Sequence, residues 1–63
     1  MKTHCKVSKD KVLQGFRTMF IEGYFAALRL NGIQIVNCRW TKAGEQCCGY
    51  DAYGECVASV TFE

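Results

Sequence analysis

One segment of the chain carries apolar residues at nearly every helical spacing and is bounded by residues that begin and end helices. Ser8 suits a helix N-cap, and Asp10 places a negative charge where the first turn favours one. Asn31 and Gly32 suit a helix C-terminus, because both tolerate the left-handed backbone conformation. This pattern predicts one helix over residues 9–30, which constrains every arrangement of the remaining residues.

Apolar side chains surround most of this predicted helix. The broad face, which we expect to pack on a sheet, consists of Val12, Leu13, Phe16, Met19, Phe20, Gly23, Tyr24, Ala26, Ala27 and Leu30. Gly23 on this face is expected to let a strand approach the helix closely. Ile21, Phe25 and Leu28 form a second apolar stripe, which we expect to be exposed in a monomer.

The second stripe predicts an interface, because contiguous exposed apolar surface usually marks one. A helix of about 22 residues spans about 33 Å, whereas a compact domain of this length is only about 27 Å across. We therefore expect homodimerisation or partner binding through Ile21, Phe25 and Leu28, with Tyr24 at the edge. The alternative is a helix kinked at Gly23, whose second stripe is covered by loop residues 42–55.

The rest of the chain predicts strands. Residues 33–40 and 56–62 are rich in β-branched and aromatic residues, residues 45–50 are expected to form a middle strand, and residues 41–44 and 51–54 look like turns. The simplest fold is α+β, with the helix packed on a three-stranded antiparallel meander (αβββ). We expect a single domain over residues 1–63, in which residues 1–8 form a tail and residues 33–63 the sheet. A loop over a two-stranded hairpin remains the alternative, and the buried face of residues 33–40 stays open.

A chain of 63 residues usually needs a disulfide, a metal or a partner subunit to be stable. Its five cysteines contain no Cys-x-x-Cys pair, the usual spacing of zinc ligands. A zinc site from His4, Cys5, Cys38 and Cys56 would require the N-terminal tail to fold across the sheet. We expect buried thiols, no metal and no cofactor, with a small zinc-stapled domain as an alternative.

The expected compartment is the cytoplasm. No apolar signal segment follows the N-terminus, and Arg17, Glu22 and Arg29 interrupt the most apolar stretch, which argues against a membrane partner. Cysteines in that compartment are expected to stay reduced.

Charge is distributed unevenly. Residues 1–42 hold all eight Lys and Arg with two acids, whereas residues 43–63 hold four acids and no base. Such a chain attracts its own copy, a nucleic acid, a charged protein surface, or simply its own other half. The nucleic-acid alternative would use Lys6, Lys9, Arg39, Trp40 and Lys42, where an aromatic ring lies between cations.

No residue pattern predicts an enzyme. The chain has one histidine and no glycine-rich phosphate loop. Paired carboxylates would have to come from Glu45, Asp51 and Glu55, which fall on turns that we expect to be solvated. We therefore predict a small, non-enzymatic intracellular protein-binding module, a homodimer that acts as a regulator or inhibitor of another protein. Small regulators encoded by phages and mobile elements share this size and style.

Overall fold

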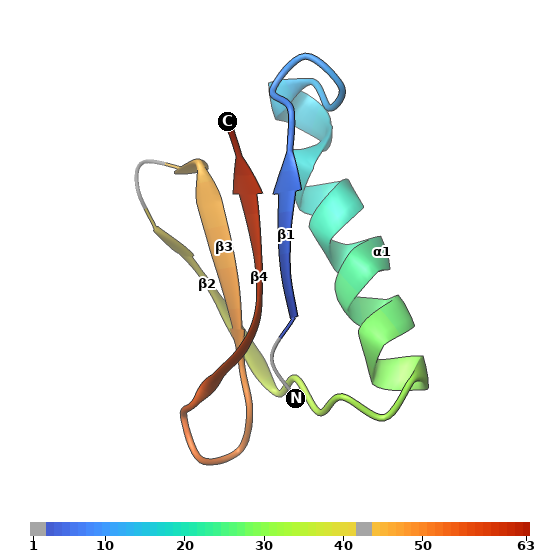
Figure 1. Ribbon diagram of the computed structural model, residues 1–63, viewed down its shortest axis with the longest axis vertical. Helices are drawn as coiled ribbons and strands as arrows, with labels where there is room; N and C mark the ends of the chain where they lie inside the picture. The colour runs from blue at the N-terminus through green and yellow to red at the C-terminus, as the bar shows by residue number, and fades with distance from the viewer. Residues whose placement is uncertain (1–2, 42–43) are drawn as a thin grey trace.

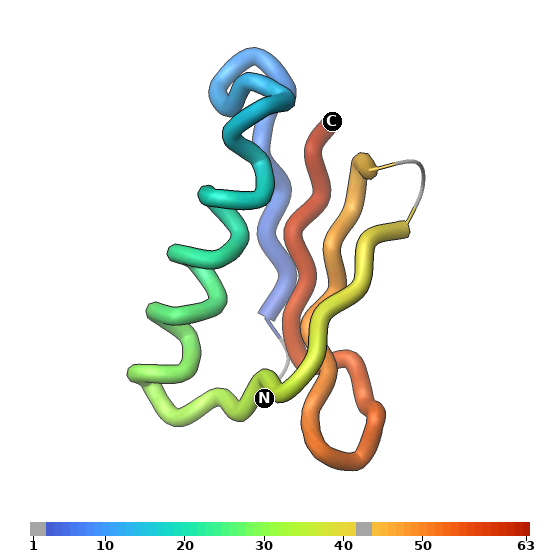
Figure 2. Tube along the Cα trace, turned by 180° about the vertical axis from the view of Figure 1, so that it is seen from behind, coloured from blue at the N-terminus to red at the C-terminus, as the bar shows by residue number. Residues whose placement is uncertain are grey.

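The structure is a computed structural model that describes residues 3–41 and 44–63. Its elements are β1 (Thr3–Val7), a short 3-10 turn η1 (Gln14–Phe16), α1 (Arg17–Leu30), β2 (Asn37–Thr41), β3 (Gln46–Tyr50) and β4 (Cys56–Phe62). The strands form one sheet in the order β1-β4-β3-β2. Figures 1 and 2 show α1 on one side of this sheet, alongside β1 and away from β2. The α+β class expected from the sequence is confirmed.

The sheet has four strands, so the expected three-stranded meander is incomplete. β2, β3 and β4 form the antiparallel meander, and β1 joins its β4 edge in the parallel direction. The expected N-terminal tail is therefore wrong. Thr3, Cys5 and Val7 point towards α1 and are half-buried, while His4 and Lys6 between them are exposed. This alternation is the pattern of a strand with one covered face.

The helix is shorter than predicted and begins at Arg17 instead of residue 9. Ser8 does not cap it. The Ser8 carbonyl accepts a hydrogen bond from the Lys11 amide at 3.0 Å, which closes a turn after β1. The C-terminal signal is confirmed, since α1 ends at Leu30 and Gly32 has a φ of 92°.

The core lies between α1 and the inner face of the sheet. Phe25 is 2% exposed, and Val60 and Phe62 of β4 are fully buried. The rings of Phe20 and Trp40 pack on Phe62, with centroids 6.0 and 6.3 Å away. Each large apolar side chain buried here contributes about 1.5–3 kcal/mol relative to an exposed one. These contacts fix which side of the helix meets the sheet.

The segment that was expected to be one strand over residues 33–40 is divided. Residues 33–36 lie outside the sheet, where Ile35 is buried in the core and Val36 is exposed. Within β2, Trp40 lies on the helix side, and strand alternation places Cys38 with it and Arg39 on the opposite face. The middle strand and the turn at residues 51–54 are confirmed, the latter by a hydrogen bond from the Gly54 amide to the Asp51 carbonyl.

The helix is shorter than the molecule, contrary to the expectation from the sequence. Its principal extents are 32 × 22 × 16 Å, and the 14 residues of α1 span about 21 Å. The helix therefore fits within the fold, and its length alone does not require a second chain.

The two oppositely charged parts of the sequence meet inside one molecule. Lys6 Nζ lies 3.8 Å from a carboxylate oxygen of Glu63, and Lys9 Nζ lies 3.2 Å from one of Glu45. Both pairs are exposed, so each contributes at most about 1 kcal/mol. Some charges of the basic and acidic parts of the sequence therefore pair with each other within one molecule.

Candidate protein interface on the helix

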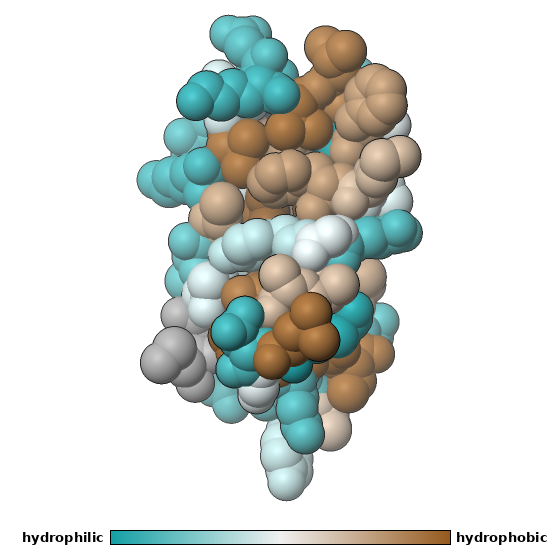
Figure 3. Space-filling model, turned by 90° about the vertical axis from the view of Figure 1, so that its right-hand side faces the viewer, coloured by the Kyte–Doolittle hydropathy of each residue, from teal (hydrophilic) through white to brown (hydrophobic). Residues whose placement is uncertain are grey.

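Large apolar side chains are exposed where the helix begins. Leu13 and Met19 are each 67% exposed, and Phe16 between them is 54% exposed. Figure 3 shows apolar surface gathered over this end of the molecule. A shallow hollow of about 400 Å³ lies among these side chains and is lined by Lys11, Val12, Leu13, Phe16, Met19 and Phe20. Apolar exposure of this kind is uncommon in small monomers unless it serves binding.

The local backbone explains why these side chains point outward. The chain turns back after β1 at Ser8 and then forms η1, in which the Phe16 amide bonds the Leu13 carbonyl at 2.8 Å. This turn leaves Leu13 and Phe16 outside, while Val12 and Phe20 beside them pack against the core cluster. The hollow is therefore lined both by exposed residues and by half-buried ones that contact the core.

The exposed apolar surface continues along α1. Gly23, Ala26 and Ala27 are exposed in the middle of the helix, and Leu30 at its end is 88% exposed. We name Leu13, Phe16, Met19, Gly23, Ala26, Ala27 and Leu30 together the outer helix surface. Glu22 and Arg29 flank it on the same side of the helix. Arg29 is oriented by a hydrogen bond from its Nε to the Ile35 carbonyl at 2.9 Å.

The interface residues expected from the sequence lie on the wrong side of the helix. Ile21 and Phe25 are buried against the sheet, and Leu28 is half-buried beside them. Tyr24 is also half-buried, with its ring between those of Phe20 and Phe25. The expectation that this stripe is exposed is therefore wrong, because it is the face that packs on the sheet. The broad face assigned to the core is instead largely the exposed one.

Gly23 also lies on the exposed side of the helix, not on the side that packs on the sheet. It was expected to admit a strand, but it is exposed, and a Cβ at this position would meet nothing within 4 Å. The close approach of helix and sheet occurs at Gly49 of β3. A Cβ there would lie 3.0 Å from Ile35 Cγ2 and 3.4 Å from Phe25 Cε2.

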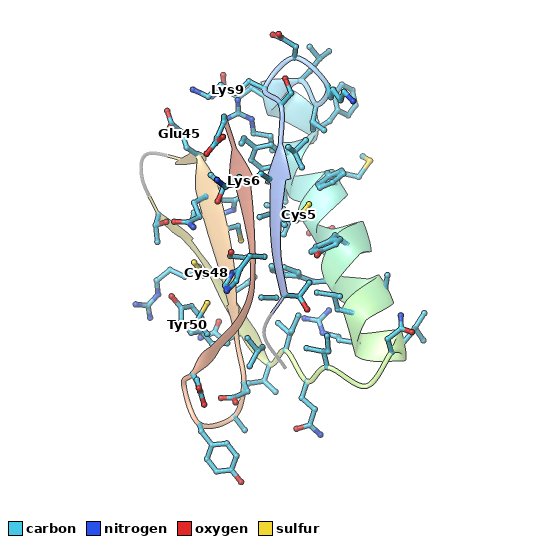
Figure 4. All side chains as sticks on the ribbon, in the orientation of Figure 1. Cys5, Lys6, Lys9, Glu45, Cys48 and Tyr50 are labelled. Carbon is cyan, nitrogen blue, oxygen red and sulfur yellow. The ribbon has the colours of Figure 1, made fainter. Side chains whose placement is uncertain are left out.

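The residues expected to contact nucleic acid are dispersed. Lys6 and Arg39 lie on the uncovered face of the sheet, at its two edge strands β1 and β2. Lys9 lies beyond β1 and pairs with Glu45, as Figure 4 shows. Trp40 points to the other face and stacks on Phe62. Lys42 lies outside the described residues.

The uncovered sheet face is polar and hydrogen-bonded. His4 Nδ1 and Ser59 Oγ lie 2.6 Å apart, and Gln46 bridges Thr41 and Thr61 through side-chain hydrogen bonds of 3.2 Å. Cys48 and Tyr50 follow one another on this face of β3 (Figure 4). Desolvation raises the pKa of the Tyr50 phenol, and the neighbouring Cys48 thiol raises it further. The phenol is therefore neutral at physiological pH.

The cysteines do not form the zinc site considered from the sequence. Cys5 and His4 are successive residues of β1 and point to opposite faces, while Cys38 lies in the other edge strand. Among the described residues no group of three or more His, Cys, Asp or Glu side chains is placed to hold a metal ion. No disulfide joins any of the five cysteines, all of which lie in the described residues. Burial raises the pKa of Cys47 to about 11, and the neighbouring Cys38 and Cys48 thiols add to the increase.

Comparisons with protein-family models, curated proteins and solved structures find no match to this chain. In the described part of the chain, no helix is long and apolar enough to cross a membrane. The interpretation of the outer helix surface therefore depends on its own residues.

Proposed function

We propose that this chain is a non-enzymatic protein-binding module that forms a homodimer through the outer helix surface and regulates or inhibits another protein by binding it. The observation that supports this proposal is the exposure of Leu13, Phe16, Met19 and Leu30 along one side of the molecule. Large apolar side chains of this kind act as anchors when a partner buries them. We further propose that it acts in the cytoplasm, where cysteines stay reduced.

The polar groups of the molecule support binding more than catalysis. Ser59 Oγ lies 2.6 Å from His4 Nδ1, but Ser59 is only 4% exposed, so a substrate would reach it poorly. Cys47 is buried as a protonated thiol, whereas a cysteine nucleophile needs the thiolate. The zinc-stapled alternative has no supporting ligand cluster in the described residues.

The test is the oligomeric state of the reduced protein, measured by native mass spectrometry and sedimentation velocity over a wide range of concentration. We expect a dimer that Met19→Glu weakens by roughly 100-fold, since a lost apolar anchor is worth at least about 2 kcal/mol. Tyr53→Glu is the matched control, because Tyr53 is also exposed but lies in the turn between β3 and β4. A monomer at every concentration would refute the homodimer.

A second candidate function is binding of single-stranded nucleic acid to the uncovered sheet face. The observation that favours it is the placement of Lys6, Tyr50 and Arg39 on this face, where cations can hold phosphates and a ring can stack a base. This candidate function has less support than the first, because Trp40 packs on Phe62 and Lys9 pairs with Glu45.

Fluorescence anisotropy with a labelled oligonucleotide tests this candidate. The double variant Lys6→Gln, Arg39→Gln should bind more weakly and reduce the slope of log affinity against log salt by about two. Lys11→Gln, which removes an exposed charge near the helix hollow instead, should have little effect. Equal losses of oligonucleotide affinity in both variants would indicate general electrostatic attraction without a defined binding site.

A further inference from the structure

We infer that α1 pairs antiparallel with α1 of a second copy, in one register in which Glu22 of each copy meets Arg29 of the other. This inference rests on the proposed function, because it uses the outer helix surface as the dimer contact. It adds the orientation of the two helices and the residues that determine it.

The exposed residues of α1 occur at regular intervals along the helix. Met19, Gly23, Ala26 and Leu30 follow one another at intervals of four, three and four residues, and all four are exposed. Residues at these intervals form the seam by which two helices pack side by side. The seam is unoccupied within the molecule, because α1 meets the sheet through Ile21 and Phe25 on its other side.

The sizes of these residues favour one antiparallel register. When the helices run in opposite directions, Met19 of one copy faces Leu30 of the other, and the same register places Gly23 against Ala26. The two large residues then form the outer layers of the contact and the two small ones the centre. Small central residues let the helix axes approach to about 8 Å, the near end of the usual range.

The flanking charges agree with this register. Glu22 and Arg29 are seven residues apart, so they occupy equivalent positions beside the seam. In the antiparallel pair, equivalent flanks face each other, which brings Glu22 of each copy to Arg29 of the other. The two-fold axis makes this ion pair twice. A parallel pair would instead place Glu22 near Ala27 and would use neither charge.

Both charged groups are available for this contact. Glu22 is exposed and forms no ion pair with another described residue. The Arg29 Nε donates to the Ile35 carbonyl, which fixes the guanidinium while its terminal nitrogens can still donate to a carboxylate. The arrangement is therefore complementary to itself, as a two-fold interface must be.

The ends of the contact extend beyond the helices. A helix of 14 residues gives a short seam, so the contact needs area on either side. The antiparallel direction carries Phe16 past the end of the facing helix, towards a hollow of about 310 Å³ in the second copy lined by Arg29, Ile33, Gln34, Ile35 and Val36. Phe16 and Val36 are both exposed in the single chain.

Charge reversal tests the register. Glu22→Arg places arginines against each other at both ion pairs, and Arg29→Glu does the same with glutamates. Each variant alone should dimerise roughly tenfold more weakly or worse, and the double variant should recover an affinity close to that of the unmodified protein. Circular dichroism of each variant checks that the fold is intact, since Arg29→Glu also removes the bond to Ile35.

Mixing the two single variants gives a sharper result. One copy then carries only arginines at these positions and the other only glutamates, so native mass spectrometry should show a heterodimer in preference to either homodimer. If the unmodified protein is monomeric throughout, the proposed homodimer itself fails. If it dimerises but the single reversals change nothing and the mixture is statistical, the register is wrong while the dimer stands.

Discussion

Gly49 shows how a single residue without a side chain keeps the two layers together. It lies in the middle of β3, opposite Ala58 of β4, directly beneath Ile35 and Phe25. Glycine usually weakens a strand, but here any larger residue would push on the core from below. The small pair Gly49 and Ala58 therefore makes room for the Phe25 ring, which is almost entirely buried.

Substitution of Gly49 should destabilise the protein in proportion to size. Gly49→Ala should cost about 1 kcal/mol and Gly49→Val about 3 kcal/mol, because the added atoms displace Ile35 and then Phe25. Urea unfolding measures both. Gly15→Ala serves as the control, since a Cβ there meets nothing within 4 Å. Equal stability of all three variants would mean that the core does not close over β3 as described.

Cys47 is the second residue whose environment has a measurable consequence. Its side chain is 1% exposed, and burial raises its pKa to about 11, so the folded state keeps the thiol proton that the unfolded chain loses above about pH 9. The unfolded state then binds fewer protons, and stability must fall as the pH rises from about 9 towards about 11. Thermal unfolding across this range should show a steeper loss for the unmodified protein than for Cys47→Ala.

Alkylation of the folded protein gives an independent check on the same thiol. Cys38 is exposed and should react first with iodoacetamide at mildly alkaline pH, whereas Cys47 should react only as fast as the protein opens. Peptide mass mapping distinguishes the two. Rapid labelling of Cys47 would show that the inner face of β3 is open.

At the level of elements, the sequence predicted those whose signals are local. The C-terminus of α1, the alternation of β4 and the turn before it depend on neighbouring residues, and the structure has all three. β1 has such a signal too, in the alternation of Thr3, Cys5 and Val7, but a lysine-rich start resembles a solvated tail. The parallel partner that makes it a strand, β4, lies at the other end of the chain.

The orientation of the helix was not predictable in the same way. Apolar residues occur on nearly all sides of it, so periodicity alone allows either Phe25 or Met19 to face the sheet. The sheet determines which side of the helix faces it, because Gly49 and Ala58 leave a space that the Phe25 ring fills. The expected interface was misplaced for this reason, although the surplus of apolar helix surface from which it was inferred is real and lies on the opposite side.

Truncation on the two sides of α1 should therefore have different effects. Phe25→Ala should cost about 3–5 kcal/mol of unfolding free energy, since it leaves a cavity between the layers. Met19→Ala should cost less than about 0.5 kcal/mol when measured at a concentration where the chain is monomeric, because its side chain contacts mainly solvent. A cost for Met19→Ala as large as that for Phe25→Ala would mean that the helix is rotated about its axis.

At the scale of the whole molecule, the fold has little material with which to stabilise itself. One helix covers one side of a four-stranded sheet in the part of the chain that is described, and the molecule is only 16 Å thick in its shortest direction. Among residues 3–41 and 44–63, the buried hydrophobic core consists of seven side chains: Ile21, Phe25, Ile35, Cys47, Ala58, Val60 and Phe62. Domains of this size are marginal without a staple, and no disulfide joins the cysteines. A second copy would bury additional apolar surface and so stabilise the fold.

This reasoning makes thermal stability depend on protein concentration. If the native state is a dimer, dilution must lower the melting temperature, because association stabilises the folded state by mass action. Met19→Glu should lower the melting temperature at high concentration and remove its dependence on concentration, since it places a carboxylate in the seam. Tyr53→Glu should leave the dependence intact, because that side chain lies in the β3–β4 turn. A melting temperature that is the same at every concentration for the unmodified protein would show that the sheet and its single helix are sufficient alone, and that the exposed apolar residues of α1 serve a different partner.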